Sequence, residues 1–342
     1  MGNRILVLGY FGYVSNKLDG QTMKTREIYD MIKRRSCRDV AFFDSEELQA
    51  GAWRLVKLLW LVLCSHTIVY LPGQNNLKRF FSPLYCVAKF CRKEIIYVVV
   101  GGWLADFLAD KPSTTKRLKR VKSLLVETSS LQANLVTHYG FDNVSLIANF
   151  RSQDFVPTIK WNKGFRIVYM GRIIPEKGCD IILDFAKYYS SLADYEAGLR
   201  IDFYGQIDVR YQERFLGRVA QYDFVSYKGV VGYHTASEVM SNYDVCVLPT
   251  FYSGEGCPGV VIDAYRAGIP VVVSHWKDIP EFVDDGKTGL IFDLERVDDF
   301  FHHLLWLRRN PDKLLQMKIY AYHKSRDHSE SKAWRVMSPL LA

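Results

Sequence analysis

The sequence predicts an α/β protein with two doubly wound domains, each built on a parallel sheet. Short apolar segments, such as 67–71 and 165–171, alternate along the 342 residues with amphipathic segments of helical length. Apolar runs of this length are typical of parallel strands that helices cover on both faces. The alternation stops once, at the polar stretch 151–164, and then starts again. A chain of this length accommodates two domains, so we place a linker there.

Each half supplies its own strands and helices. In the first half we expect strands at 4–10, 39–44, 67–71, 94–102 and 144–150, and helices at 22–35, 56–65 and 133–140. In the second half we expect strands at 165–171, 199–205, 223–229, 244–250 and 269–274, and helices at 179–192, 210–222, 236–243, 260–268, 298–310 and 311–325. Alternating strands and helices of these lengths indicate βαβ units.

Cysteine usage and hydropathy narrow the class of protein. Seven cysteines are scattered without a CxxC pair or regular spacing, which argues against a disulfide framework and a zinc site. We therefore expect a reducing, cytoplasmic compartment, and no secretory signal pattern is visible. The longest apolar stretch, 55–71, has 17 residues and contains Lys57 and His66. It is too short and too polar for a membrane span and divides better into a helix and a strand.

Charge is distributed unevenly between the two halves. Residues 1–164 contain 24 Lys and Arg against 13 Asp and Glu, a net of +11. Residues 165–342 contain 21 against 24, a net of −3. A basic half predicts an anionic partner, such as nucleic acid, a phosphorylated ligand or anionic lipid headgroups. Solvated cationic helix faces are the alternative interpretation.

Charged and glycine-bearing loops follow several strands of the second half. The loop "GRIIPEKG" (171–178) supplies Arg172 and Lys177 near the start of the next helix. Ligands of open parallel sheets bind beyond the carboxyl ends of the strands, and two cations beside a helix N-terminus suit a diphosphate. Two exposed surface cations are the alternative. Gly205 and the loop 227–234 suit a flat base or a ribose, or are plain turns.

The stretch "GEGCPGVVIDAYRAGIPVV" (254–272) is more specific. Glu255 lies in the loop above the end of a strand, and Asp263 lies one turn into the following helix. A carboxylate accepts several hydrogen bonds and therefore suits hydroxyl groups, including those of a ribose. The backbone N–H groups around the start of such a helix bind anions. A solvated loop acid and an exposed helix acid are the alternative interpretation.

The carboxylate-x7-carboxylate pattern, preceded by "GRIIPEKG", resembles the retaining glycosyltransferases of family 4, or group 1. The resemblance is closest to members that build bacterial surface polysaccharides. It covers the second half almost end to end, where "DFYGQ" and "PEFVDDGKTGLIF" follow in the family's order. It implies the GT-B fold, two Rossmann-like domains facing across an interdomain cleft. The domains would be 1–155, which binds the acceptor, 156–325, which binds the nucleotide sugar, and a helix at 326–342 that crosses back to the first.

The resemblance also implies a role for each matching residue. Glu255, Arg172 and Lys177 would be the catalytic residues, since the two cations would hold the donor diphosphate and Glu255 would bind hydroxyls of the donor sugar. Asp263 would hold the ribose. The other donor-binding positions would be Gly171, Gly205, Val230, Gly256, Cys257, Pro258, Gly259 and Val260. The chain departs from the family pattern at Asp263, where Glu is commoner, and at Pro258, where many members have glycine.

The first half matches the family more loosely. Many relatives carry a histidine after the strand that begins at 94, whereas this chain reads Gly101-Gly102-Trp103, with Asp106 as the nearest acid. The candidate cleft residues of this half are Gly20, Gln21, Thr22, Gly102 and Asp106. No catalytic side chain can be assigned among them from sequence.

The function that the resemblance implies is retaining transfer of a hexose-type sugar. The donor would be a nucleoside-diphosphate sugar, most simply a UDP-sugar, and the acceptor a lipid-linked or oligosaccharide substrate of capsule, O-antigen or exopolysaccharide synthesis. No Asp-x-Asp pair is present, so we expect no metal and no cofactor beyond the nucleotide-sugar co-substrate.

A lipid-linked acceptor would explain the basic first half. Segments 56–64 and 75–93 mix Lys and Arg with aromatic residues and leucine, which suits a membrane surface. We expect a peripheral protein on the inner leaflet of the bacterial cytoplasmic membrane. Buried helix faces whose cations extend to solvent are the alternative, and this fits 56–64 better than 75–93.

Four other functions remain for comparison. A sugar-nucleotide epimerase is disfavoured by the Glu255–Asp263 spacing, and a non-catalytic binding subunit would differ only in turnover. A nicotinamide oxidoreductase is disfavoured because the first loop reads "GYFG" and not GxGxxG. Nucleic-acid binding fits the charge, but no motif supports it.

Overall fold

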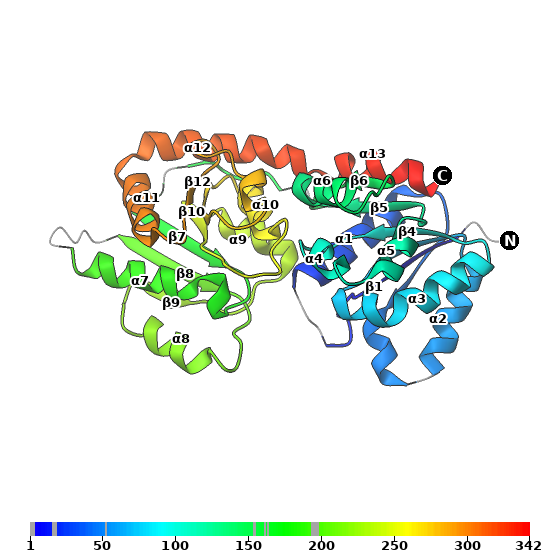
Figure 1. The fold of residues 1–342 in the computed structure, drawn as a ribbon. Helices are drawn as coiled ribbons and strands as arrows, with labels where there is room; N and C mark the ends of the chain where they lie inside the picture. The colour runs from blue at the N-terminus through cyan, green and yellow to red at the C-terminus, as the bar shows by residue number, and fades with distance from the viewer. Residues whose placement is uncertain are drawn as a thin grey trace. The chain divides into compact units, whose positions relative to one another are not determined.

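The chain divides into two compact units (Figure 1). The computed structural model describes residues 4–15, 19–51, 53–152, 155–160, 162, 164–192 and 198–342. The first unit contains Met1–Ser152 and His328–Ala342, and the second contains Gln153–Asp327. The sequence places these boundaries at 155 and 325, and part of the expected linker, 151–164, lies outside the described residues. Each unit is an α/β layer structure, which confirms the predicted fold class.

Six parallel strands form the sheet of the first unit, in the order β2-β1-β3-β4-β5-β6. The strands are β1 (Ile5–Gly9), β2 (Val40–Asp44), β3 (Thr67–Leu71), β4 (Glu94–Val98), β5 (Ser123–Val126) and β6 (Val144–Leu146). The helices are α1 (Gly20–Arg35), η1 (Ser45–Ala50), α2 (Trp53–Cys64), α3 (Gln74–Phe90), α4 (Leu104–Leu108), α5 (Pro112–Leu118), α6 (Ser129–Thr137) and α13 (Glu330–Leu341). The turn η5 (Ser325–His328) precedes α13.

Alternation of side chains along β1 explains why the sequence shows continuous apolar runs. Ile5 and Val7 pack in one hydrophobic cluster with α1 and α13, whereas Leu6 and Leu8 pack in another with α2 and α3. Successive side chains of a strand point to opposite faces of the sheet. Because helices bury both faces, every position of the strand is apolar.

The second unit repeats this design with the strand order β12-β11-β10-β7-β8-β9. The strands are β7 (Phe165–Met170), β8 (Leu199–Tyr204), β9 (Val225–Tyr227), β10 (Val245–Leu248), β11 (Val271–Ser274) and β12 (Gly289–Phe292). The helices are η2 (Pro175–Lys177), α7 (Cys179–Ser190), α8 (Gln212–Val219), η3 (Tyr233–Thr235), α9 (Ala236–Met240), α10 (Gly259–Arg266), η4 (Ile279–Phe282), α11 (Val297–Arg309) and α12 (Pro311–Lys324). The order reverses between β7 and β10, which makes their loops the switch point of the sheet.

Some elements differ from the sequence-based expectation. The sequence predicts that α1 starts at Thr22, with Gly20 and Gln21 in the preceding loop, but α1 begins at Gly20. Asp19 explains the difference: its side chain accepts from the N–H groups of Gln21 and Thr22, while Thr22 Oγ1 accepts from the N–H of Asp19. This capping box fixes the first turn. The helices expected from sequence also do not include α3, and four short elements were not predicted, namely β5, β12, α4 and α5.

A network of buried polar groups secures α12 to the sheet of the second unit. Lys318 is buried, and its Nζ donates to Asp244 Oδ1 at 2.7 Å and to the carbonyl of Lys160 at 3.0 Å. Asp244 also accepts from Asn162 Nδ2 and from the N–H of Arg166, both at 2.9 Å. A buried charge pair persists only where hydrogen bonds satisfy its remaining atoms, and this pair meets that condition.

In the part of the chain that the structure describes, no helix is both long and apolar enough to cross a membrane. The seven cysteines are all free.

Helix α13 is held on α1 by an ion-pair cluster. Glu330, in the first turn of α13, accepts from Arg35 Nε at 2.5 Å and pairs with Arg34 as well. Both arginines lie in the last turn of α1, where cations also complement the helix dipole. Burial by itself raises the pKa of a carboxyl, but hydrogen bonds from Arg35, Ser152 and Arg34 outweigh it and hold the pKa of Glu330 below its ordinary value of 4.5.

Replacing Glu330 with Gln tests this connection through its pH dependence. A carboxyl whose pKa is lowered by folding stabilises the protein above its ordinary pKa, and the contribution disappears as pH falls through the folded-state value. We expect Glu330→Gln to lower the free energy of unfolding by up to about 1 kcal/mol at neutral pH. The difference from wild type should vanish in acid, as urea titrations at a series of pH values would show. Glu295→Gln, at an exposed acid, is the control; a Glu330→Gln effect that does not change with pH would contradict this role for Glu330.

Candidate functional site

The loops after β7 and β10 meet at the switch point of the second sheet. Lys177, at the end of the β7 loop, donates from Nζ to Glu255 Oε2 at 2.6 Å. The two residues are 78 positions apart in the sequence, and β7 pairs directly with β10. The sheet topology therefore brings together the lysine and the carboxylate that the sequence singled out.

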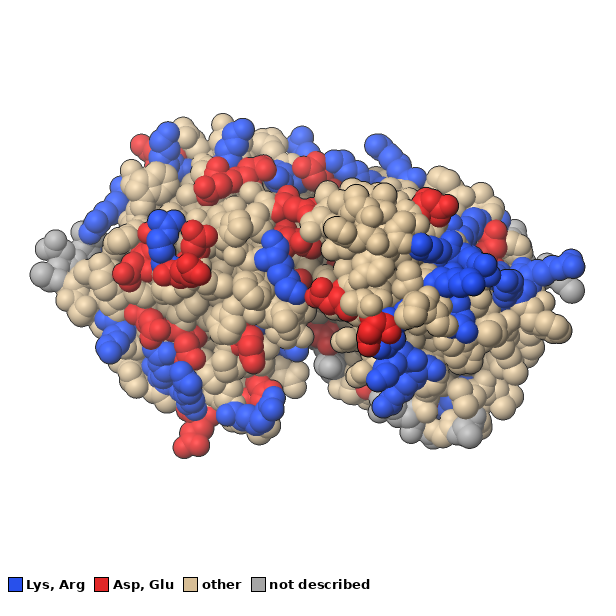
Figure 2. Space-filling view, viewed as in Figure 1, with Lys and Arg blue, Asp and Glu red and all other residues tan. Residues whose placement is uncertain are grey.

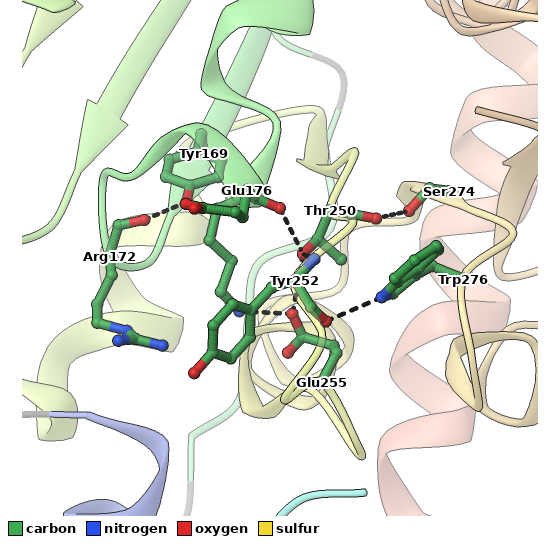
Figure 3. Close-up of polar contacts among 9 residues, drawn as sticks. Tyr169, Arg172, Glu176, Thr250, Tyr252, Glu255, Ser274 and Trp276 are labelled. Carbon is green, nitrogen blue, oxygen red and sulfur yellow. Dashed lines mark hydrogen bonds and ion pairs between the residues drawn. The ribbon is translucent and has the colours of Figure 1, made fainter. Parts of the chain in front are cut away.

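Glu255 is buried, with 7% of its surface exposed, so it is not the solvated loop acid of the alternative interpretation. Thr250 Oγ1 lies 3.0 Å from the same oxygen, Oε2, and 3.3 Å from the carbonyl of Glu176. The contacts that Lys177 and Thr250 make with the carboxylate thus converge on Oε2 (Figure 3). This arrangement fixes the carboxylate through one oxygen and leaves Oε1 outside both contacts.

Tyr252 lies beside both cations of the site. Its ring centroid is 4.9 Å from the Arg172 guanidinium carbon and 5.2 Å from Lys177 Nζ. In the view of Figure 3 the ring lies between the Arg172 guanidinium and the Glu255 carboxylate. Cation–π contacts of this kind restrict the two side chains. The ring therefore holds the charges in place at the end of the sheet.

A buried tyrosine supports the Arg172 backbone. The hydroxyl of Tyr169, on β7, donates to the carbonyl of Arg172 at 2.6 Å. Burial raises the pKa of Tyr169 well above its ordinary value, so the hydroxyl keeps its proton and remains a donor. Burial also raises the pKa of the neighbouring Cys179 thiol to about 12. Both groups are neutral supports of the loop and carry no charge of their own.

The loop that carries Thr250 and Tyr252 is held by the segment after β11. Ser274 Oγ donates to the carbonyl of Thr250 at 2.5 Å, and Trp276 Nε1 donates to the carbonyl of Tyr252 at 2.8 Å (Figure 3). Lys277 Nζ donates to the carbonyl of Ser253. These donors come from the neighbouring strand of the sheet and the loop that follows it. The loop before Glu255 is therefore fixed along most of its length.

Two glycines are required by close backbone approaches at the site. Gly178 has φ +75°, and a Cβ there would lie 1.9 Å from the carbonyl oxygen of Pro249. Gly205 has φ +139°, and a Cβ there would lie 1.7 Å from the carbonyl oxygen of Gly171. Only glycine tolerates these distances and angles. From sequence, Gly205 was either a contact for a base or ribose or part of a plain turn. In the structure, its immediate role is to let the loops after β7 and β8 pair.

The remaining donor-site candidates line the start of α10. This helix begins at Gly259, with Pro258 at the N-cap, as the sequence indicated. Gly256 and Cys257 precede it, and Cys257 is buried. Asp263 is only 7% exposed, so it is not the exposed helix acid of the alternative interpretation. Val260 is half-buried, while Val230, after β9, is exposed.

The candidate residues of the first unit are more dispersed. Thr22 is fully buried in the capping box of α1, and the Gln21 side chain packs against Gly73. Gly102 precedes α4, and Asp106 lies exposed on it. The structure thus uses Thr22 for folding.

Sequence reasoning missed two buried groups of the first unit. Lys24 and Glu127 form an ion pair at 3.1 Å, with side chains 2% and 6% exposed. Glu127 follows β5, which the sequence analysis did not identify, so nothing placed this carboxylate at the end of a strand. From the amphipathic pattern of its helix, Lys24 would be expected to face solvent.

In the second unit the missed residues are Thr250, Tyr252 and Trp276. Their contacts join segments that are distant in sequence or depend on backbone carbonyls, which side-chain patterns do not reveal. The one available signal was the position of Tyr252 in a loop between the motifs "GRIIPEKG" and "GEGCPGVVID", which could have marked it as a site residue. Among the described residues, no group of three or more His, Cys, Asp or Glu is arranged to hold a metal ion.

The fold and the site together define a protein of the GT-B class: two doubly wound parallel sheets, with cations and a carboxylate at the switch point of the second. Residues 164–310 match the family model described as "Glycosyl transferases group 1". The second unit is therefore similar to the group 1 glycosyltransferases, and the match, which covers less than half of the chain, includes the sheet and site of that unit.

Similar proteins agree with this assignment. The chain is 29% identical over 266 residues to the sulfoquinovosyl transferase SQD2 of Arabidopsis thaliana, which covers 73% of this chain and 45% of that protein. It is 41% identical over 59 residues to the O-antigen chain mannosyltransferase B of Escherichia coli, covering 17% and 14% of the two chains. The chain thus spans less than half the length of these curated relatives.

Solved structures share the fold over the whole chain. Anabaena HepE in complex with UDP superposes with a TM-score of 0.76 and 14% identity, covering 99% of both chains. Sucrose-phosphate synthase from Thermosynechococcus elongatus superposes with a TM-score of 0.74 and 14% identity, covering 98% of both. At this identity the likeness shows the fold alone.

Replacing Gly178 with Ala tests the close approach beneath the site. The new Cβ would collide with the carbonyl of Pro249 in a backbone conformation that alanine disfavours. We expect Gly178→Ala to lower the free energy of unfolding of the second unit by at least about 2 kcal/mol, measured by chemical denaturation.

Gly217→Ala is the matched control for this prediction. Gly217 lies inside α8, and outside the helix backbone no atom lies within 4 Å of the position that a Cβ would take. There alanine should raise the free energy of unfolding by about 0.5 to 1 kcal/mol, because it is the better helix former. Equal effects of the two substitutions would refute the role given to Gly178.

Proposed function

We propose that this protein transfers a sugar from a nucleoside-diphosphate sugar to a hydroxyl acceptor, with the donor bound at the switch point of the second unit. The observation that carries the proposal is the ion pair between partly buried Lys177 and buried Glu255 beside Arg172, within the segment that matches the group 1 family. A carboxylate and two cations in one fixed loop cluster suit a ligand that has both hydroxyl and diphosphate groups.

The contacts of the site assign a part of the donor to each side chain. Lys177 has three N–H donors and gives one of them to Glu255, so it retains two for diphosphate oxygens. Arg172 adds a planar guanidinium, and the N–H groups at the start of α10 add a further anion site. Glu255 Oε1 would accept from sugar hydroxyls, and Asp263 from the ribose.

Transfer at this site breaks the bond between the anomeric carbon and the diphosphate oxygen. Negative charge then develops on the departing diphosphate, where Lys177 and Arg172 stabilise it. The acceptor oxygen bonds to the anomeric carbon on the face that the diphosphate leaves, and its proton passes to a departing phosphate oxygen. This course retains the anomeric configuration and needs no metal and no carboxylate nucleophile. Family 4 membership is part of the same proposal.

The donor and acceptor are proposed from the relatives. HepE has been solved with UDP and with UDP-glucose, so a UDP-hexose is the first donor to test. The E. coli relative is named for the O-antigen chain, which supports a lipid-linked or oligosaccharide acceptor in bacterial polysaccharide synthesis. The acceptor would bind the first unit, and the enzyme would work at the inner leaflet of the cytoplasmic membrane.

Glu255→Gln and Glu255→Ala test the proposed donor site. With UDP-, GDP- and ADP-sugars and detergent-solubilised bacterial lipid as acceptor, we expect wild-type protein to release nucleoside diphosphate from one donor. Loss of the carboxylate should reduce this rate by about 10²- to 10³-fold. Glu213→Gln, at an exposed acid of α8, is the control and should retain the wild-type rate.

Two outcomes would contradict this proposal. Wild-type turnover that survives both Glu255 substitutions would remove Glu255 from the site. Absence of both release and thermal stabilisation by every nucleotide would remove the donor site itself. Stabilisation without release, under any acceptor, would favour an epimerase or a non-catalytic binding subunit.

Chelation tests the proposed independence from metal. Because protein cations are assigned to the diphosphate, release of nucleoside diphosphate should continue at the same rate in EDTA. Added Mg²⁺ or Mn²⁺ should leave the rate unchanged as well. A rate that falls in EDTA and returns with either ion would contradict the assignment of Arg172 and Lys177 as the groups that neutralise the leaving diphosphate.

A further inference from the structure

Helix α2 presents its apolar residues to solvent. The exposed residues of this helix are all hydrophobic: Trp53, Leu55, Val56, Leu59, Trp60 and Leu63. Trp53, Trp60 and Val56 are 60%, 56% and 68% exposed. Only Leu61 and Val62 of the helix are buried. A buried apolar face with outward cations was the alternative interpretation of this segment, and the exposure of these six residues contradicts it.

The cations of α2 lie beside this face and turn toward Glu47 of the same unit. Arg54 Nη1 pairs with Glu47 Oε2 at 2.5 Å, and Lys57 Nζ pairs with the same oxygen at 3.1 Å. A surface helix of a globular protein ordinarily turns its apolar stripe inward and its charges outward. In α2 this order is reversed, so the helix does not maximise burial of its own apolar residues in this unit.

The exposed apolar residues form one continuous face. At about 100° per residue, the six positions fall within about half of the helix circumference, and they extend over about 15 Å of the axis. Cations border the aromatic residues: the Arg4 guanidinium lies 5.8 Å from the Trp60 ring, and that of Arg54 lies 3.8 Å from the Trp53 ring. An apolar face of this size, ringed by polar groups, marks an interaction site.

The segment that carries this face has an excess of cations, although Glu47 pairs with Arg54 and Lys57, and Asp39 pairs with Arg4. Residues 48–93 contain seven Lys and Arg and no Asp or Glu. Lys93 Nζ donates to the carbonyl of Leu63 at 2.7 Å, which brings the end of α3 next to the end of α2. There Lys89 and Arg92 are exposed, and Phe90 is 90% exposed. Lys and Arg side chains also gather on the face of this unit drawn in Figure 2.

We propose that the apolar face of α2, with the end of α3, inserts into the headgroup region of a bilayer that contains anionic lipids. Tryptophan and leucine enter the interface between headgroups and acyl chains, while neighbouring Lys and Arg bind the lipid phosphates. Charge complementarity selects this occupant over a second copy of the chain, because two copies joined here would bring the excess cations of both 48–93 segments together.

The proposal deepens the proposed function, because it names the surface from which a lipid-linked acceptor would be reached. Its physical basis is independent of the donor site. Membrane binding is therefore measured without donor or acceptor, so that failure of the glycosyl transfer and failure of the docking surface give different results.

Vesicle co-sedimentation of the full chain tests the proposal. We expect binding to vesicles of phosphatidylcholine with phosphatidylglycerol and at least tenfold weaker binding to phosphatidylcholine alone. The double variant Leu59→Ser/Trp60→Ser should lose binding to the anionic vesicles by at least tenfold. Because both side chains are exposed, its thermal unfolding should match wild type.

The double variant Leu315→Ser/Ile319→Ser is the matched control. It removes two apolar side chains that are comparably exposed on α12, in the second unit, and it should bind as wild type does. A second variant, Lys89→Gln/Arg92→Gln, should weaken binding severalfold at low salt and lose this difference at high salt, where charges are screened.

Three results would overturn the proposal. The first is wild-type binding by the α2 variant. The second is equal loss of binding in the α2 and α12 variants, which would indicate non-specific adsorption. The third is a concentration-dependent dimer in sedimentation velocity that the α2 variant abolishes, together with no binding of wild type to anionic vesicles; this would assign the face to a second copy.

Discussion

The ion pair between Lys177 and Glu255 is the contact on which the organisation of the second unit's site depends. It joins two loops 78 residues apart, and it exists because β7 and β10 are neighbours where the strand order reverses. The carboxylate is buried and the ammonium is partly buried, so the carboxylate without its partner would be a desolvated charge. The pair thus fixes the position of the Glu255 carboxylate, which accepts hydrogen bonds, relative to the Lys177 ammonium, which donates them.

The rest of the site supports this pair through backbone contacts. Gly178 allows the β7 loop to approach the end of β10, and Gly205 allows the β8 loop to approach Gly171. From the other side, Ser274 and Trp276 hold carbonyls of the loop before Glu255. The Tyr252 ring then fills the space beside Arg172 and Lys177. Charged side chains on loops are precise only when the loops themselves are fixed, and here most of the fixing is done by main-chain groups.

The first unit is specialised differently. Lys24 of α1 and Glu127, which follows β5, form a buried ion pair. The most unusual feature of this unit is instead the exposed apolar face of α2. In α2 the cations satisfy Glu47 and the apolar residues face outward. The excess of positive charge in the first half of the sequence therefore accompanies an exposed apolar helix, which solubility alone does not explain.

Much of the fold was determined by the sequence itself. Segment 67–71 was predicted with the bounds of β3, and the residues of "GRIIPEKG" and "GEGCPGVVID" were predicted beyond strand ends and at the start of a helix. The spacing of apolar residues and the residue types of turns are local properties. Strands and helices with a strong apolar pattern can therefore be predicted from the sequence. Short elements such as β5 and β12 carry too few residues for a pattern, and the start of α1 depended on the Asp19 capping box.

Only the tertiary structure decided which charges meet and which faces are covered. Nothing local to Lys177 identifies Glu255 as its partner, because their proximity follows from the order of strands in the sheet. The same holds for Tyr252, whose ring lies beside the Arg172 and Lys177 side chains. It holds for Thr250 and Trp276 as well, which contact backbone carbonyls of other segments. In α2, the hydrophobic pattern predicted a helix correctly but not which side faces the core. The amphipathic period is the same in either orientation, and the position of Glu47 and of the sheet beneath α2 determines the choice.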